Sequence, residues 1–406
     1  MTRRVVVTGI GCVSSLGVGT SALWEGLVRA RTAITPTRLV QAGLEVTLPA
    51  APVTGFVPLD HFTADELPMR DAFAQYAVVA AREAMRDAGL GRGETKPGDT
   101  AVVLGSGGGG EHTREEAAVR LFGERKLRCS PMLVPKTNNQ AAVGFVSMEF
   151  QVTGPSFVIS TGCAAATHAI AQAFHMIRHG VVRRAITGGS EAPVALSVFQ
   201  AFDAARVLSH TTCRPFSRER DGMVIGEGGG ILVLEELESA RKRGAFIYAE
   251  VLGAGMSADA SSSVYPREQG PAQAIAMALR EARLNADQID YINAHGTGTQ
   301  VNDRVETMAI KLAFGEHARE LTVSSTKSLH GHTFGGAGGI ETVATLLALK
   351  HGVAPPTVNY LGPDADCDLD YAPNDPKPRR IDVALKQSFA FGGLNAVLVL
   401  RRDVVQ

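Results

Sequence analysis

The chain has 406 residues, of which 45% are hydrophobic and 20% charged, a composition typical of a globular protein with one large core or two packed halves. Its formal net charge of −1 gives no overall basic field of the kind that nucleic-acid binding favours. No run of about 18 apolar residues and no signal-peptide pattern occurs, so we expect no membrane association and a cytoplasmic location.

Short β-rich segments alternate with helical patterns along the whole chain. In chain order they include RRVVVTGIG (3–11), FAQYAVVAAREAMRDAGL (73–90), TAVVLGSGGGG (100–110), PSFVIS (155–160), RRAITGG (183–189) and GGILVLEEL (229–237). The alternation continues with YAEVLGAGMS (248–257), QAIAMALREARL (273–284), IDYINAHG (289–296), LTVSSTKS (321–328) and NAVLVLRR (395–402). Alternating strands and helices predict an α/β protein with largely parallel sheets.

The second half of the chain repeats a pattern of the first. The segments FHMIRHGVV (174–182) and LLALKHGVA (346–354) have apolar residues at helical spacing and end at glycines suited to a helix C-cap, Gly180 and Gly352. Aligning the two segments places Gly335 opposite Cys163. We therefore expect a duplicated fold that divides into residues 1–250 and 251–406. No Pro/Ser-rich linker separates the halves, so they should pack as one body.

Cys163 is the cysteine whose surroundings favour reactivity. The five cysteines are widely spaced, without a disulfide or zinc pattern, so we expect free thiols and no metal site. Cys163 follows the strand 155–160 and opens a predicted helix over 163–180. Its small neighbours Gly162 and Ala164 leave backbone N–H groups open to a carbonyl oxygen, and a helix N-terminus favours a thiolate. A small core cysteine is the alternative interpretation.

Two histidines and a lysine follow later strands. His295 stands at the end of the strand 289–296, before a Gly/Thr loop, and active groups gather at such strand ends in α/β folds. Lys327 and His332 precede a Gly-rich helix start. Because His332 lies three residues before the counterpart of Cys163, the sulfur and the imidazole are expected to face one pocket. The alternative interpretation of His295 is a structural histidine whose hydrogen bonds are made within the loop.

Two further features have structural interpretations. Asp303 and Glu306 have the spacing of a capping box at the start of the next helix. Phe391, in SFAFGGLN (388–395), precedes two glycines that favour a mobile turn. A core aromatic that closes a sheet is the alternative interpretation of Phe391.

Four segments resemble the signature blocks of a known family: GPSFVISTGCAAATHAI (154–170), NAHGTGTQVND (293–303), SSTKSLHGHTFGGAGGIE (324–341) and SFAFGGLN (388–395). In this order and spacing they look like those of the β-ketoacyl-acyl-carrier-protein synthases of the type II elongating kind. The resemblance covers the chain from residue 3 to residue 402. It implies the thiolase fold, a duplicated five-layer αβαβα arrangement of the α/β class.

The resemblance implies a decarboxylative Claisen condensation and hence an acyltransferase. Cys163 would take an acyl group from the phosphopantetheine thiol of an acyl carrier protein. His295 and His332 would stabilise the enolate that forms when a malonyl thioester loses carbon dioxide. The enolate would attack the Cys163 thioester and extend a fatty acyl or polyketide chain by two carbons. Lys327 matches the family's active-site lysine, whose acidic partner would be Glu306. No bound cofactor is implied.

Other positions match substrate-binding residues of that family. Thr297 and Thr299 match residues that bind the pantetheine arm. Phe391 matches a gating phenylalanine, whose backbone N–H would form an oxyanion hole with that of Cys163. The acyl pocket would be lined by Gly108, Leu133, Val134, Val198 and Phe202, with Leu133 on a segment that closes the pocket of a dimer partner.

The sequence departs from the family pattern at Gly108, where elongating synthases often carry a bulkier residue. The missing side chain predicts a longer cavity and acceptance of long or rigid acyl chains. An acyl-chain profile confined to short saturated substrates would count against this hypothesis. The departures favour a specialised polyketide, polyene or nodulation-type pathway over housekeeping fatty-acid elongation.

The resemblance also implies partners. Four basic residues match positions that bind the acidic carrier protein in that family: Arg125, Lys126, Arg128 and Arg206. The alternative interpretation is that these residues form an ordinary solvent-exposed charged surface. We expect a homodimer, or the catalytic half of a heterodimer with a chain-length factor.

Two other functions remain as alternatives. A chain-length-factor-like subunit would share the fold but lack the nucleophile, so Cys163, His295 and His332 argue against it. A degradative thiolase would need a second catalytic cysteine near the C-terminus, and Cys367 lacks a suitable glycine context.

Overall fold

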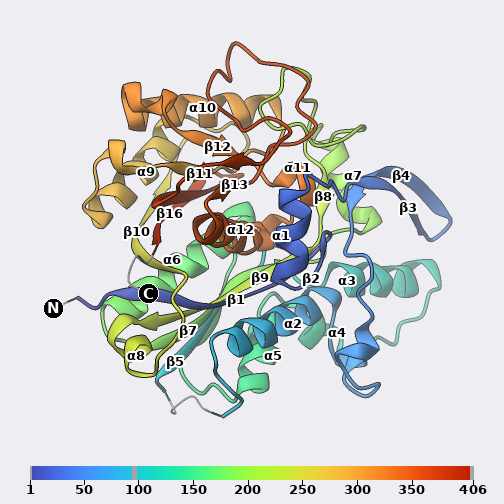
Figure 1. Cartoon of the computed structure of the whole chain (residues 1–406). Coiled ribbons are helices and arrows are strands. Elements are labelled where there is room, and N and C mark those ends of the chain that lie inside the picture. The colour runs from blue at the N-terminus through green and yellow to red at the C-terminus, as the bar shows by residue number, and fades with distance from the viewer. Residues whose placement is uncertain (1, 94–97, 403–406) are drawn as a thin grey trace.

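The structure, a computed structural model, describes residues 2–93 and 98–402. Two arrays of five strands are joined by a short pairing of β1 with β10 (Figure 1). In sheet order, the first array contains β6 (Ser156–Ile159), β5 (Thr100–Gly105), β7 (Arg184–Glu191), β9 (Gly228–Glu236) and β1 (Val5–Ser14). The second contains β10 (Ala249–Ala258), β16 (Leu394–Arg402), β15 (Val383–Ala390), β11 (Tyr291–Asn293) and β12 (Thr322–Ser324).

The two arrays have the same strand order and the same strand directions. In the first, β9 is antiparallel to both β1 and β7, whereas β7, β5 and β6 are parallel. In the second, β16 is antiparallel to both β10 and β15, whereas β15, β11 and β12 are parallel. A register irregularity recurs between Val7 and Gly9 and between Val251 and Gly253. The expected duplication is therefore confirmed, but the sheets are mixed rather than largely parallel.

Helices lie in three layers around these arrays. Between the arrays lie α6 (Ala165–Arg178) and α12 (Ala337–His351). The outer face of the first array is covered by α2 (Ala72–Asp87) and α5 (Ala141–Phe150), and that of the second by α9 (Gln269–Ala282) and α10 (Gln300–Phe314). This gives the five layers that the family resemblance implies.

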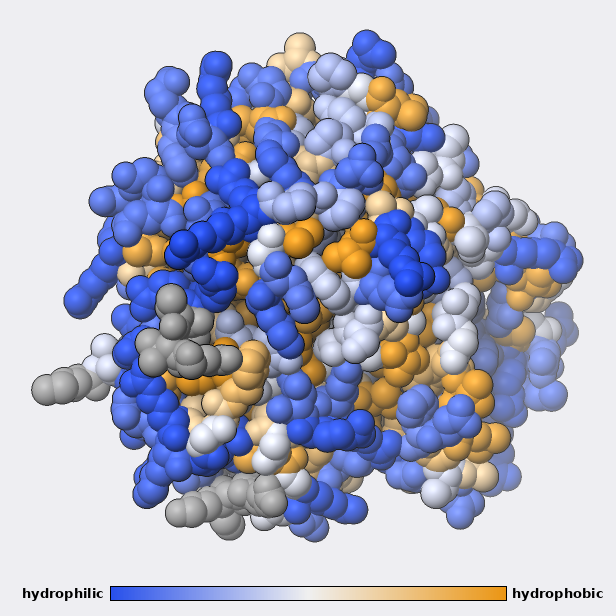
Figure 2. Space-filling view, in the orientation of Figure 1, coloured by the Kyte–Doolittle hydropathy of each residue, from blue (hydrophilic) through white to orange (hydrophobic). Residues whose placement is uncertain are grey.

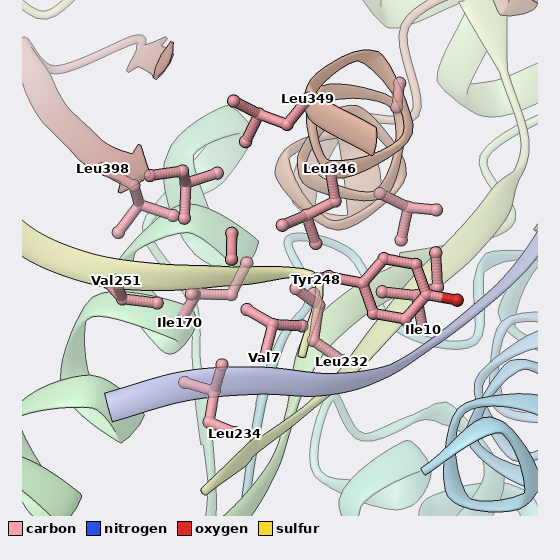
Figure 3. Close-up of a cluster of buried hydrophobic side chains, with 14 of the residues drawn as sticks. Val7, Ile10, Ile170, Leu232, Leu234, Tyr248, Val251, Leu346, Leu349 and Leu398 are labelled. Carbon is pink, nitrogen blue, oxygen red and sulfur yellow. The ribbon is translucent and has the colours of Figure 1, made fainter. Parts of the chain in front are cut away.

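The central core lies where the two middle helices meet both arrays. Figure 3 shows Ile170 of α6 and Leu346 of α12 among strand side chains that include Leu232 and Leu398. Nearly every residue of α12 is buried, as expected for a helix that is apolar around its whole circumference. On the outside, polar side chains cover most of the face drawn in Figure 2, and hydrophobic ones form scattered groups.

Glycines bring the outer helices close to the central strands. A Cβ on Gly11 of β1 would overlap the backbone oxygen of Ala80 in α2. At the equivalent place in the second half, a Cβ on Gly255 of β10 would overlap the backbone oxygen of Ala274 in α9. Close approach of the helix backbone thus requires glycine at both positions.

Both middle helices begin with a 3₁₀ turn, and the two turns contact each other. Cys163 is the middle residue of the turn before α6, and Gly335 is the middle residue of the turn before α12. The glycines that follow these helices, Gly180 and Gly352, have φ of 79° and 65°. The alignment of the repeats and both expected glycine caps are therefore confirmed. A Cβ on Gly335 would overlap the backbone nitrogen of Gly107.

The remaining elements surround this frame. They are β2 (Gly17–Val18), α1 (Thr20–Val28), β3 (Thr35–Gln41), β4 (Leu44–Ala51), α3 (Glu111–Ala118), α4 (Leu133–Thr137), α7 (Leu196–Ala204), β8 (Ile225–Gly226), α8 (Leu237–Lys242), α11 (Lys327–His330), β13 (Val353–Ala354) and β14 (Lys377–Pro378). The expected division between residues 250 and 251 falls within β10. Within residues 2–93 and 98–402, no helix has the length and apolar character needed to cross a membrane.

Candidate active site

A cavity of about 290 Å³ is lined by residues of both halves of the chain. The first half contributes Cys163 and Phe202. The second half contributes His295, Thr297, Thr299, His332 and Phe391. The structure therefore brings the predicted sulfur, both imidazoles and both threonines to one cavity.

Cys163 lies in the 3₁₀ turn Gly162–Ala164, between β6 and α6. Gly162 has φ of 56°, a left-handed conformation that favours glycine, and a Cβ there would lie 3.5 Å from the Cβ of Ala390. The end of β15 is thus adjacent to this turn. Ala164 is fully buried, so no bulky neighbour separates the sulfur from the cavity.

Burial acts against the thiolate that the helix N-terminus is expected to favour. It raises the pKa of Cys163 to about 12, and the nearby positive charge of Lys327 offsets this only in part. Attack of the Cys163 thiol on a thioester requires loss of its proton.

The two histidines lie against each other in the cavity wall. His295 follows β11, and His332 follows α11, where its backbone N–H donates to the oxygen of Val224 at 2.7 Å. The ring centroids of His295 and His332 are 5.3 Å apart, with the planes nearly perpendicular. Phe389 contacts the His295 ring edge and Phe334 that of His332, so aromatic side chains fix both imidazoles.

Both imidazoles are neutral. Burial and then the charge of Lys327 hold the pKa values of His295 and His332 well below the ordinary value. The Lys327 Nζ is 3.5 Å from Nδ1 of His295, and because an ammonium only donates, this nitrogen accepts and Nε2 carries the proton. Neither ring nitrogen of His332 has a hydrogen-bond partner among the described residues. The pair can therefore donate to an oxygen that gains negative charge.

The acidic partner of Lys327 is Glu341, not Glu306. The Lys327 ammonium donates to Oε1 of Glu341 and, at 2.5 Å, to the backbone oxygen of His295. Glu306 instead accepts from the backbone N–H groups of His295 and Gly296, each at 2.7 Å, and burial raises its pKa to about 7. The proposed Lys327–Glu306 pairing is therefore wrong, because Glu306 is turned toward the loop backbone.

The capping-box prediction is also wrong. α10 begins at Gln300 with Thr299 as its N-cap, so Asp303 and Glu306 lie inside the helix. Asp303 accepts from the backbone N–H groups of Phe216 at 2.7 Å and Gly298 at 3.2 Å. Together with Glu306, it fixes the loop that carries Thr297 and Thr299. The hydroxyl oxygens of these two threonines are 2.9 Å apart and face the cavity.

Phe391 lies in the turn between β15 and β16 and is about half exposed, at 49%. Gly392 and Gly393 follow it with φ of 85° and 69°, which supports a tight turn rather than a core aromatic. Of the expected acyl-pocket residues, Phe202 lines the cavity and stacks on Phe334 with centroids 4.5 Å apart.

The other expected acyl-pocket residues do not line this cavity. Val198 packs in the same hydrophobic cluster as Cys163, whereas Val134 on α4 is 63% exposed and Leu133 is half-buried. Gly108 does not line this cavity, and a Cβ there would point at the side chain of Glu111, which Arg114 holds at 2.7 Å. The expected lengthening of the acyl pocket at Gly108 stays a prediction.

The expected carrier-docking residues lie in two places. Arg206 lines the cavity that contains Cys163. Lys126 and Arg128 line a separate hollow, and Lys126 pairs with Glu124 at 2.7 Å. Arg125 lies on the same exposed segment and has a left-handed backbone, with φ of 54°. In the described ranges 2–93 and 98–402, no cluster of three or more His, Cys, Asp or Glu residues has the arrangement of a metal site.

The sequence analysis missed Glu341, Phe389 and the second lysine that contacts Glu341, Lys386, whose Nζ is 2.8 Å from Oε2. The sequence did contain a signal for Glu341, because its carboxyl group lies in the Gly-rich, apolar start of α12. A charge buried in such a segment needs a partner of opposite charge.

Sequence profiles of one family match most of the chain. The profile described as "Beta-ketoacyl synthase, N-terminal domain" matches residues 2–240, and "Beta-ketoacyl synthase, C-terminal domain" matches residues 248–361.

Similar proteins span the whole chain. Nodulation protein E of Rhizobium sp. is 45% identical, over 99% of this chain and 100% of that protein. The 3-oxoacyl-[acyl-carrier-protein] synthase 2 of Synechocystis sp. is 40% identical, over 98% of each. The solved ishigamide ketosynthase/chain length factor has a TM-score of 0.93 and 34% identity, over 99% of this chain and 100% of that one. These matches confirm the expected thiolase fold.

Proposed function

Because the chain belongs to the β-ketoacyl synthase family, we propose that it is a β-ketoacyl-acyl-carrier-protein synthase that condenses a malonyl thioester with an acyl group held on Cys163. As an acyltransferase it uses substrates on the phosphopantetheine arm of a carrier protein and has no bound cofactor of its own. The observation that carries the proposal is the shared cavity, which one thiol of the first half and two neutral imidazoles of the second half line together.

The first step loads Cys163. Its thiol attacks the carbonyl carbon of the acyl thioester, and the carbonyl oxygen gains negative charge. The backbone N–H groups of Cys163 and Phe391 stabilise this charge by donating hydrogen bonds to the oxygen. The carbon–sulfur bond to the pantetheine breaks, and the departing thiolate takes the proton that Cys163 loses. This transfer accounts for a nucleophile whose pKa is about 12, because no free thiolate has to persist in the buried site.

The second step forms the carbon–carbon bond. His295 and His332 donate hydrogen bonds to the thioester oxygen of the malonyl group, while Thr297 and Thr299 hold the pantetheine arm. The bond to the malonyl carboxylate breaks, carbon dioxide leaves, and the electron pair forms an enolate. The enolate carbon attacks the acyl carbonyl on Cys163, and the Cys163 sulfur leaves and takes a proton from solvent. The product is two carbons longer and stays on its carrier.

Basic and apolar side chains at the surface support carrier docking and assembly with a partner chain. Arg206 lies at the cavity, where an acidic carrier would deliver its arm, and Arg125, Lys126 and Arg128 would contact the carrier from a partner chain. The exposed apolar side chains of Val134 on α4 and of neighbouring segments suit burial against that partner, a second copy or a chain-length factor as in the ishigamide structure.

The relatives favour a specialised pathway. The protein named Nodulation protein E is 45% identical, against 40% for 3-oxoacyl-[acyl-carrier-protein] synthase 2. We therefore assign the chain to a specialised acyl pathway. This assignment rests on the sequence identities, because the position of Glu111 beside Gly108 gives no support for a longer cavity. The compartment we assign is the cytoplasm, where reducing conditions keep a catalytic thiol free, and cell fractionation tests it.

The experiment incubates the purified protein with malonyl-carrier and a panel of acyl-carriers of different length and unsaturation. We expect an acyl adduct on Cys163 by peptide mass spectrometry and β-ketoacyl-carrier products two carbons longer. Cys163→Ala should abolish both, whereas Cys129→Ala, the same change at an exposed thiol, should keep both. A panel in which only short saturated chains are extended would overturn the specialised assignment.

The competing function is a non-catalytic, chain-length-factor-like subunit. It predicts that Cys163→Ala keeps full condensation when the partner is supplied. That result, or a wild-type protein that is never acylated by any carrier, would overturn the proposed synthase activity.

A further inference from the structure

Glu341 lies between two buried lysine side chains. Lys327 pairs with its Oε1, and the Nζ of Lys386 lies 2.8 Å from its Oε2. All three side chains are fully buried. Two positive charges therefore surround one negative charge, so the cluster has a net positive charge directly behind the cavity wall. Buried charges of this kind are retained only where each has partners.

The Lys386 ammonium has three polar neighbours. It forms an ion pair with Glu341, and it donates to the backbone oxygen of Gln387 and to Oγ of Ser388, the latter at 3.1 Å. Lys386 comes from β15, in register with Asn293 of β11, and does not line the cavity that contains Cys163. It therefore cannot touch the substrate.

A continuous line of contacts joins Lys386 to one reacting imidazole. Lys386 contacts Glu341, Glu341 contacts Lys327, and Lys327 contacts both the backbone oxygen and Nδ1 of His295. Among the described residues, no hydrogen bond joins Lys327 to Cys163, whose sulfur is affected by the Lys327 charge only through space. The other route from Lys386, through Ser388 to Thr167 of α6, is uncharged and does not reach the sulfur. The influence of Lys386 should thus fall on the histidine side of the reaction.

We propose that Lys386 is a positioning residue for the decarboxylation step: its ammonium anchors Glu341, which fixes Lys327 against His295, and it supplies a second positive charge behind the imidazole pair. The inference rests on the proposed synthase function. A fixed positive charge behind two neutral donors favours the negative charge that develops on the malonyl thioester oxygen, and it is in place before the reaction begins. A neutral side chain of similar size would pack there but would leave Oε2 of Glu341 without its partner.

The charges around Lys386 support this role. Burial lowers its pKa to about 8, and Glu341 opposes that change. Lys386 in turn contributes to the lowered pKa values of both histidines, after burial and Lys327. The titratable groups that face Lys327, Glu341 and Lys386 from the surrounding elements include Glu306, His295, His330, His332, Tyr291 and Cys163.

The test separates the two half-reactions. Lys386→Met removes the charge and keeps an unbranched chain, and Lys350→Met makes the same change at an exposed lysine of α12. Carbon dioxide release from malonyl-carrier reports decarboxylation, and mass spectrometry reports acylation of Cys163. We expect Lys386→Met to slow decarboxylation about ten-fold or more, as loss of an outer partner of a reactive group commonly does, and to change acylation less than about two-fold.

A pH profile and a double variant distinguish positioning from a general loss of structure. In the wild type, decarboxylation should fall as the pH rises through about 8, where the ammonium is lost, and Lys386→Met should lose this dependence. Lys386→Met in a Glu341→Gln background should add little to the effect of Glu341→Gln alone, because both act through one contact. If Lys386→Met fails to fold, Lys386→Arg, which keeps the charge, should fold and keep decarboxylation close to the wild-type rate, and a slow decarboxylation in a folded Lys386→Arg would contradict the role of the charge.

The outcomes are distinct. A wild-type protein without condensation overturns the proposed function itself. An active wild type in which Lys386→Met behaves like Lys350→Met overturns the inference, and so does an equal loss in both half-reactions, which would show a purely structural role.

Discussion

At the scale of single residues, Glu191 shows how a buried carboxylate shapes the surroundings of the site. It ends β7 and accepts hydrogen bonds from the backbone N–H groups of Gly107 at 2.5 Å and Gly109 at 2.9 Å, and from the hydroxyl of Ser106 at 3.1 Å. These contacts fold the glycine-rich segment after β5 against the turn that carries Cys163. Burial nevertheless raises the pKa of Glu191 to about 7.

The raised pKa makes stability depend on pH. Because the folded pKa lies above the ordinary value of 4.5, the contribution of Glu191 is fully present below pH 4.5 and is lost as the pH rises through about 7. We expect Glu191→Gln to lower the free energy of unfolding at pH 5. The wild type should lose free energy of unfolding between pH 5 and pH 8, and Glu191→Gln should make this loss smaller by on the order of 3 kcal/mol. Urea unfolding at both pH values measures this change.

The control for that measurement is Glu238→Gln, at an exposed carboxylate on α8. It should leave the pH dependence as in the wild type. Glu306 also has a pKa raised to about 7, so part of the dependence should persist in Glu191→Gln. An unchanged slope in Glu191→Gln would contradict the assignment.

That Cys163, His295 and His332 lie in one cavity was predictable from the sequence, and their partners were not. All three stand next to glycine-rich segments, Cys163 and His295 after strands and His332 after a short helix. Glu341 was missed because its partners come from other elements, and spacing along the chain gives no information about such contacts. The burial that raises the pKa of Cys163 was not predictable either, because it depends on the layers above and below the turn.

At the scale of elements, the two halves use one packing device twice. Gly11 brings α2 onto β1, and Gly255 brings α9 onto β10. Each contact lies one layer away from the cavity, so it sets the position of the strands on which the site is built.

The two glycines should respond alike to substitution. We expect Gly11→Ala and Gly255→Ala each to lower the free energy of unfolding by about 3 kcal/mol, because the added methyl overlaps a helix backbone that cannot move independently. Gly144→Ala in α5, where nothing lies within 4 Å of the added methyl, is the matched control and should be neutral or slightly stabilising. Thermal or urea unfolding compares the three; a neutral result for either of the first two would contradict the packing argument.

The order of strands and helices along the chain was predictable, since hydrophobic periodicity and glycine caps identify elements one by one. Strand direction was not, because the antiparallel strands β9 and β16 are buried along most of their length and so have the continuous apolar runs typical of parallel strands. The hairpin of β3 and β4 was not predicted either. Its strands are mostly exposed and lack the apolar run on which strand prediction depends.

At the scale of the whole molecule, the first array ends in an unprotected edge. Of the described strands, β6 is last in the sheet order and pairs with β5 alone. Its side chains are exposed or half-buried, and Phe157 is among the exposed large hydrophobic residues, as is Met148 on the neighbouring α5. An exposed apolar edge of this kind is a template for pairing with another chain.

Assembly through this edge is testable by light scattering coupled to gel filtration. We expect the purified chain to form a dimer, and Phe157→Asp to shift it to the monomer by about ten-fold or more in dissociation constant, because a buried carboxylate would face an apolar partner. Val40→Asp on the hairpin strand β3, also an exposed apolar position, should leave the dimer intact. A chain that forms a dimer only after addition of a chain-length factor would identify the heterodimer. A chain that stays monomeric both alone and with a chain-length factor would contradict assembly through this edge.

The pair of matching 3₁₀ turns also fixes how many acyl groups a molecule can hold. Gly335 occupies the place of Cys163 in the second turn, and any side chain there would overlap Gly107. If Cys163 is loaded as proposed, the duplicated scaffold has a single loading point, because the second turn has no thiol in the corresponding place. Titration with excess acyl-carrier should therefore saturate at one equivalent per polypeptide in intact mass spectra, and a second equivalent would show that sulfur outside the shared cavity is also reactive.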